Sequence, residues 1–189
     1  MKLLRVALMT LGALGLPASA LAQPASSLWS RATAPGAREA LRHRRAASWI
    51  NFLDELPEFL RDRLAPERTD LSHDTLRREA LAHLDRALAL APDDVRSLSP
   101  AAHLRERLGD LDGALRDASR ALELDPDGPS AQDAHFTLAV VHTWQGEHVA
   151  CRDHYLASLR FPMSDYARSI VLGNLGDAYL ALGDMRAAV

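Results

Sequence analysis

The chain has 189 residues, of which 48% are hydrophobic and 5% aromatic, and its formal net charge is −3. This charge argues against nucleic acid as the main partner, because domains that bind nucleic acid are usually strongly positive. The single cysteine excludes an intramolecular disulfide.

The first 22 residues are predicted to be a secretory signal peptide. Lys2 and Arg5 give a positive start, residues 6–16 form an apolar core, and a small-x-small cleavage site precedes Gln23. The core is too short for a stable membrane span, which needs roughly 20 residues. We therefore expect a periplasmic or secreted protein with no stable membrane span after cleavage. An uncleaved anchor is the alternative, and the lack of a cysteine at the cleavage site argues against a lipid anchor.

The next two segments lead into the repeats. Residues 23–36 are rich in Pro, Ala, Ser and Thr and are predicted to be a flexible linker. Residues 37–65 show helical periodicity and are predicted to form N-terminal capping helices, with Pro57 marking a kink or a new helix start. Their arginines are interpreted as a solvated face, with a lipid or acidic-partner patch as the alternative. The apolar face of this segment is expected to contain Trp49, Ile50, Leu53, Leu56 and Leu60.

Residues 66–189 repeat themselves. Gly109, Gly146 and Gly183 lie 37 residues apart, and each is followed by an acidic residue and, five positions after the glycine, by a small one. Upstream, residues 87–93 recur 34 residues later with the alanine, both leucines, the proline and the aspartate in register. Repeats of roughly 20 to 50 residues are typical of solenoids, in which each unit buries its apolar face against its neighbours.

The first two repeat units are predicted to be unequal. The first contributes mainly its second helix, residues 74–90, with Ser72 or Asp74 as the N-cap. The second spans about residues 98–126. Its first helix is expected to start at Ser99, because Pro100 is acceptable only in a first turn.

The third unit is predicted over residues 131–161, and the fourth begins near Tyr166. The extra residues of the longer period are placed in the loops around 128–130 and 162–164. The fourth unit reaches residue 189 early in its second helix. Because solenoid ends normally carry a polar cap, we expect a fragment of a longer protein. Three residues would then lack a partner helix: Leu172, Leu175 and Tyr179.

The pattern around the glycines resembles a known repeat. Residues 109–126 combine a glycine turn, a helix with Ala114 and Ala121 seven residues apart, and a helix-ending proline. This block resembles the second helix of a tetratricopeptide repeat (TPR), and the first-helix half of the same pattern lies at residues 172–184. The resemblance implies an all-α fold, a right-handed superhelical solenoid of antiparallel helix pairs with about three to four repeats, the last incomplete.

The resemblance also implies a function. TPR solenoids bind partners in a concave groove lined mainly by the first helices, so we expect a non-catalytic interaction scaffold of the bacterial cell envelope that binds a peptide or protein. The groove is expected to be polar at one end and apolar at the other, although Phe136 and Trp144 could instead pack under another segment. The candidate groove residues are His103, Arg107, Phe136, Val140, Thr143, Trp144, Ile170 and Asp177, with Asp133, Gly173 and Leu180 beside them.

No residue pattern points to chemistry. His148, Cys151 and His154 have spacing that could serve a metal, but the two histidines share a poor helix face and Cys151 stands where other units have alanine. We expect a packed thiol, and His135 and His142 as core or boundary residues. No nucleophile with a base, phosphate loop or carboxylate pair stands out, so we expect no cofactor, no metal and no enzyme activity. The alternative function is a regulatory or substrate-delivering arm of a larger enzyme or secretion component.

Overall fold

The computed structural model describes residues 35–188, and this part of the chain is all-α, as predicted. The predicted signal peptide and most of the predicted linker lie outside the described residues, whereas the last two linker positions already belong to a helix. The helices are α3 (Pro35–Glu55), α4 (Glu58–Leu64), α5 (His73–Leu90), α6 (Val95–Arg107), α7 (Leu111–Leu124), α8 (Ala131–Gln145), α9 (His148–Ser158) and α10 (Asp165–Ala181).

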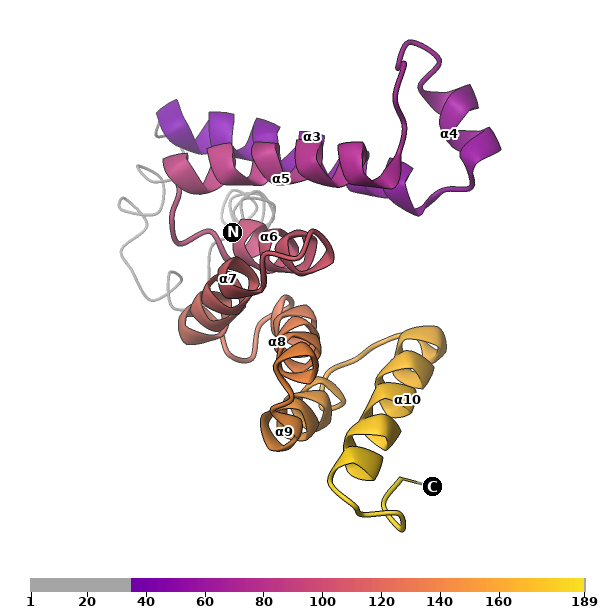
Figure 1. Ribbon diagram of the computed structural model, residues 1–189. Coiled ribbons are helices and arrows are strands. Elements are labelled where there is room, and N and C mark those ends of the chain that lie inside the picture. The colour runs from indigo at the N-terminus through magenta and orange to yellow at the C-terminus, as the bar shows by residue number, and fades with distance from the viewer. Residues whose placement is uncertain (1–34, 189) are drawn as a thin grey trace, which may run out of the picture.

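Helices that are close in sequence pack on one another. The main contacts join α3 to α5, α6 to α7, and α8 to α9. Further contacts join α7 to α8, α9 to α10, α5 to α6, and α6 to α8. In Figure 1 these pairs follow one another from α3 and α5 at the top, through α6 and α7, to α8 and α9 below, with α10 at the lower right.

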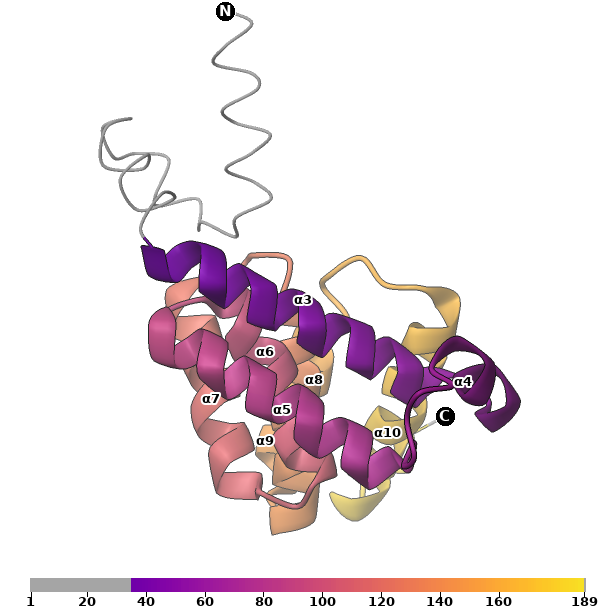
Figure 2. The same cartoon turned by 90° about the horizontal axis from the view of Figure 1, so that it is seen from above.

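Helix α3 is the antiparallel partner of α5. Asp54 at the end of α3 meets His73 at the start of α5, with 2.6 Å between Oδ1 and Nδ1. Arg44, nearer the start of α3, binds Asp94 beyond the end of α5, at 2.7 Å. Figure 2 shows the two helices side by side. Helix α3, which belongs to the predicted capping segment, therefore packs along α5, and Pro57 directly precedes the short helix α4, where a kink or a new helix start was predicted.

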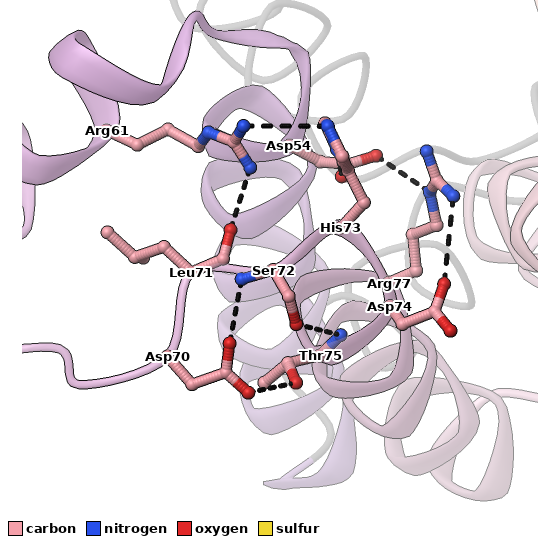
Figure 3. A network of polar contacts seen from close by, with 9 residues as sticks. All are labelled: Asp54, Arg61, Asp70, Leu71, Ser72, His73, Asp74, Thr75 and Arg77. Atoms are coloured by element: carbon pink, nitrogen blue, oxygen red, sulfur yellow. Dashed lines mark hydrogen bonds and ion pairs between the residues drawn. The ribbon is translucent and has the colours of Figure 1, made fainter.

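A polar network joins α3, α4 and the start of α5 (Figure 3). The Asp54 carboxylate, whose side chain is 2% exposed, accepts hydrogen bonds from His73 and from Arg77 Nε, the latter at 3.0 Å. Arg61 donates to the carbonyl of Leu71 at 2.7 Å. These bonds satisfy a buried charge from several sides, which is the condition under which a buried carboxylate is tolerated.

The three repeated glycines form the predicted turns. Gly109, Gly146 and Gly183 have φ of 84°, 74° and 78°, and among the described residues no other type has a positive φ. Glycine occupies this left-handed region without the steric cost of a Cβ. The acidic residue after the glycine also has a role, since Asp110 caps α7 by accepting from the N–H of Gly113 at 2.9 Å.

Replacing Gly146 with alanine is expected to lower the free energy of unfolding by about 1 kcal/mol, because the added Cβ strains the left-handed backbone. Gly173→Ala is the matched control. Gly173 lies inside α10, and a Cβ there meets no atom within 4 Å, so alanine is expected to stabilise the protein by roughly 0.5 kcal/mol or more. Urea unfolding of both variants measures the two effects. Shifts of the same sign would contradict the assigned turn.

The predicted start of the second unit is wrong. Helix α6 begins at Val95, not at Ser99, and Pro100 lies inside it. The missing N–H of Pro100 forfeits only the bond to the carbonyl of Arg96, four residues earlier. Val95 and Leu98 are both buried in the core of this region. Their burial favours the extra turn over a helix that starts just before the proline.

Small residues of α7 and α9 are packed in the core, and Cys151 is the packed thiol that was predicted. Ala114, Ala118 and Ala121 are buried on one face of α7. Cys151 takes the same place in α9, where its thiol is buried and lies 3.0 Å from Thr143 Oγ1. Close helix contact therefore depends on small side chains at these positions.

Three apolar residues differ from their predicted surroundings. Trp49, expected on the apolar face of the first helix, is about half exposed, whereas Ile50 and Leu53 are buried as expected. Leu175 is only 6% exposed because it packs in the core formed by α8, α9 and α10, and Tyr179 packs against the same core. The expectation that these two lack a partner is wrong, since α8 and α9 already cover them.

Candidate binding groove

Two neighbouring hollows lie along α8, and each is lined in part by residues of this helix. The first hollow has a volume of about 450 Å³ and lies among α3, α6, α8 and α10. It is lined by Asn51, Glu55, Ser99, Pro100, His103, Gln132, Asp133, Phe136, Thr137, Ala167, Ile170 and Val171. The second hollow, of about 230 Å³, lies among α8, α9 and α10. It is lined by Val140, Thr143, Trp144, His148, Cys151, Tyr155, Asn174, Asp177, Ala178 and Ala181.

Most candidate groove residues lie in these hollows. The first hollow contains His103, Phe136 and Ile170, together with Asp133. The second contains Val140, Thr143, Trp144 and Asp177. Three of the sequence candidates line neither hollow: Arg107, Gly173 and Leu180.

Helix α8 supplies the continuous wall. Phe136, Val140 and Trp144 are spaced by four residues and therefore share one helix face. Phe136 and Val140 are half-buried, whereas Trp144 is 70% exposed. The opposite face carries buried residues such as Leu138 and Val141, which hold α8 in the core. The two faces of α8 therefore differ. One face packs in the core and holds the helix in place, and the other face presents apolar side chains to the hollows.

Burial sets the charge state of the first hollow. Burial, together with the positive charges of Arg107 and Arg77, lowers the pKa of His103 to about 4, so this side chain is neutral at pH 7. Burial also raises the pKa of the Asp133 carboxyl. In α6, burial raises the pKa of Glu106, and a contact with Trp144 opposes that rise.

Three histidines meet between α8 and α9, in an arrangement that the sequence analysis missed. His135 Nδ1 lies 3.0 Å from His154 Nδ1, and the His154 ring stacks on His142 with 5.4 Å between centroids. His148, which the sequence pattern had joined to His154, instead lines the second hollow beside Cys151. Within residues 35–188, no group of three or more His, Cys, Asp or Glu side chains could hold a metal ion. His135 and His142 belong to α8 and His154 belongs to α9, so no short sequence motif contains all three histidines.

Asp54 and His73 form a carboxylate–histidine pair of the kind found in catalytic dyads, but the pair lies outside both hollows. Its carboxylate is also bound by Arg77, and the second ring nitrogen of His73 lies 3.5 Å from Arg61 Nη2. Neither residue of the pair lines either hollow. This pair is therefore assigned to the contact between α3 and α5.

No protein-family model matches the chain, and no curated protein matches it. From residue 35 to residue 188, the helices are all too short or too polar to cross a bilayer. The two hollows and their lining residues are therefore the features of the described chain that point to a function.

Proposed function

We propose that the chain is a TPR-like, right-handed superhelical solenoid that acts as a non-catalytic scaffold. In this assignment α3 and α5, α6 and α7, and α8 and α9 are the first three helix pairs, and α10 is the first helix of a fourth. The sequential contacts between the helices and the left-handed glycines after α6, α8 and α10 support it. The helix α3 replaces a separate cap as the first helix of the first pair.

The binding surface is proposed to be the groove formed by the two hollows. The observation that carries this proposal is that α8 and α10 line both hollows with apolar side chains left partly exposed, while α6 lines the first hollow beside them. Trp144 is the largest of these, and Ile170 adds to the exposed apolar surface. Exposed apolar patches rimmed by polar residues are typical of protein interaction sites. An extended or helical peptide with an aliphatic or aromatic anchor near Trp144 fits this surface.

The partner is proposed to be a protein of the bacterial periplasm or the extracellular space. The predicted signal peptide of residues 1–22 supports this location. The groove would then bind a segment of a secreted or envelope protein.

Alanine at Trp144 tests the groove. Peptides selected from a displayed random library on the purified protein are expected to bind at least tenfold more weakly to Trp144→Ala, because interface energy concentrates in buried aromatic anchors. Val149→Ala is the control, since Val149 is 55% exposed and lines neither hollow. Fluorescence anisotropy gives the affinities, and circular dichroism checks the fold. Equal losses for the two variants would contradict the proposal.

A further inference from the structure

Among the residues that the structure describes, carboxylates line the two hollows, whereas lysine and arginine do not. Glu55 and Asp133 line the first, and Asp177 lines the second. The chain has 22 lysine and arginine residues, yet none of those described lines either hollow. His103, the basic residue of the first hollow, is neutral at pH 7 because burial lowers its pKa to about 4. The first hollow therefore presents carboxylates without a lining cation beside them.

A buried hydroxyl marks the first hollow as more than an acidic surface. Thr137 lines this hollow and is 1% exposed. Within the described part of the chain, its Oγ1 has no hydrogen-bond partner. An unpaired buried polar atom destabilises the folded chain, so a ligand that donates a hydrogen bond to it would recover part of that cost.

The Asp133 carboxylate also lacks compensation. Asp133 is an exposed residue, but the atoms around its carboxyl group remove part of its hydration and raise its pKa, and no neighbouring cation opposes the rise. By contrast, the carboxylates of Asp54 and Asp94 are each paired with an arginine, Arg77 and Arg44. A positive charge in the first hollow would stabilise the ionised form of Asp133.

We propose that the first hollow receives an arginine or lysine side chain of the partner, so that the groove selects basic peptides. This inference depends on the proposed peptide-binding function. Asp133 and Glu55 would face the charged group, and Thr137 would accept a hydrogen bond from it. Phe136 and Ile170, which line the same hollow, would contact the aliphatic stem, as long basic side chains bury their stems against apolar surface. The neighbouring Trp144 would hold an apolar residue of the same peptide.

Three labelled synthetic peptides test the inference. They share their length and their leucine positions and carry arginine, glutamine or glutamate at all other positions. The arginine peptide is expected to bind about tenfold more tightly than the glutamine peptide, and the glutamate peptide more weakly than both. Asp133→Asn is expected to weaken the arginine peptide roughly fivefold and to leave the glutamine peptide unchanged.

A matched charge change is the control. Asp127→Asn removes the same charge from an exposed residue in the loop between α7 and α8, outside both hollows. It is expected to change the affinity of the arginine peptide less than twofold, because Asp127 lines neither hollow and the intervening solvent and salt screen its charge from the bound peptide. Equal effects of Asp127→Asn and Asp133→Asn would show that only the overall charge attracts the peptide, and would overturn the inference.

A second variant removes the hydroxyl without removing charge. Thr137→Val is expected to leave the stability unchanged or raised, since the hydroxyl is unpaired, and to weaken the arginine peptide about threefold. Unaltered affinity would contradict the role given to Thr137.

The outcomes separate this inference from the proposed function. If the glutamine peptide binds as tightly as the arginine peptide and Trp144→Ala weakens both, the groove stands and the selection of basic peptides fails. If Trp144→Ala leaves the affinities of all three peptides and of the library peptides unchanged, the proposed groove itself is refuted.

Discussion

Asp54→Ala is expected to lower the free energy of unfolding by about 3 kcal/mol, because it removes the buried partner of Arg77 and leaves this arginine only the distant, exposed carboxylate of Asp74. The carboxylate accepts from His73 at 2.6 Å and from Arg77 at 3.0 Å, and only the histidine is well exposed. The substitution weakens the contact between α3 and α5, because Asp54 belongs to α3 and both of its partners belong to α5. Urea unfolding followed by circular dichroism measures it.

Asp74→Asn is the control for this experiment. Asp74 also faces Arg77, but at 4.0 Å and with a side chain 68% exposed. Exposed pairs of this kind contribute less than about 1 kcal/mol, so little change is expected. If the two variants lost the same stability, Asp54 would not be the residue that joins α3 to α5.

Lowering the pH from 6.5 towards 4 is expected to destabilise the protein through His103 and His154. Burial is the main cause that lowers the pKa of each from 6.5 to about 4, and the charges of neighbouring arginines or histidines add to it. Between these values the unfolded chain binds protons that the folded chain excludes. Stability is therefore complete above pH 6.5 and is lost as the pH falls. For His103 the loss is at most about 3 kcal/mol, from 1.36 kcal/mol for each pKa unit.

Buried carboxyls act in the opposite direction. Burial raises the pKa values of Asp133, Glu106 and Asp117, so the folded chain takes up their protons first as the pH falls, which favours folding. The histidine contribution is isolated by comparing the wild type with His103→Gln and His154→Gln at each pH. Each variant is expected to lose less stability than the wild type between pH 6.5 and 4. Parallel curves would contradict the assignment.

Local features of the fold were predictable from sequence because single residues decide them. The three glycines are suited to left-handed turns whatever surrounds them, and all three adopt that conformation. Cys151 was predicted to be packed because it replaces a small residue, and it is buried. Ser72, one of two predicted N-caps of α5, accepts from the N–H of Thr75.

Contacts between distant segments were not predictable in the same way. The pairing of α3 with α5 crosses the intervening helix α4, and no short motif records it. The meeting of His135 with His154 depends on how α8 and α9 turn against each other. Pro100 gave the wrong helix start because tertiary burial of Val95 and Leu98 outweighed the local preference.

The TPR resemblance supplied the choice of helices for the candidate groove, and helix periodicity supplied the residues of α8 that share a face. Phe136, Val140 and Trp144 line the hollows for this reason. Arg107 does not, although its charge helps to lower the pKa of His103. The contribution of α3 to the first hollow, through Asn51 and Glu55, required the structure. That contribution makes the first hollow more acidic than the first helices of the repeats alone would suggest.

The groove as the binding surface is tested most directly by NMR of isotopically labelled protein titrated with a selected peptide. The account predicts that chemical-shift changes gather at residues of α8 and α10 that line the two hollows, and that the indole N–H of Trp144 is among the most affected signals. Changes confined to α5 and α7, with the Trp144 indole unmoved, would contradict it.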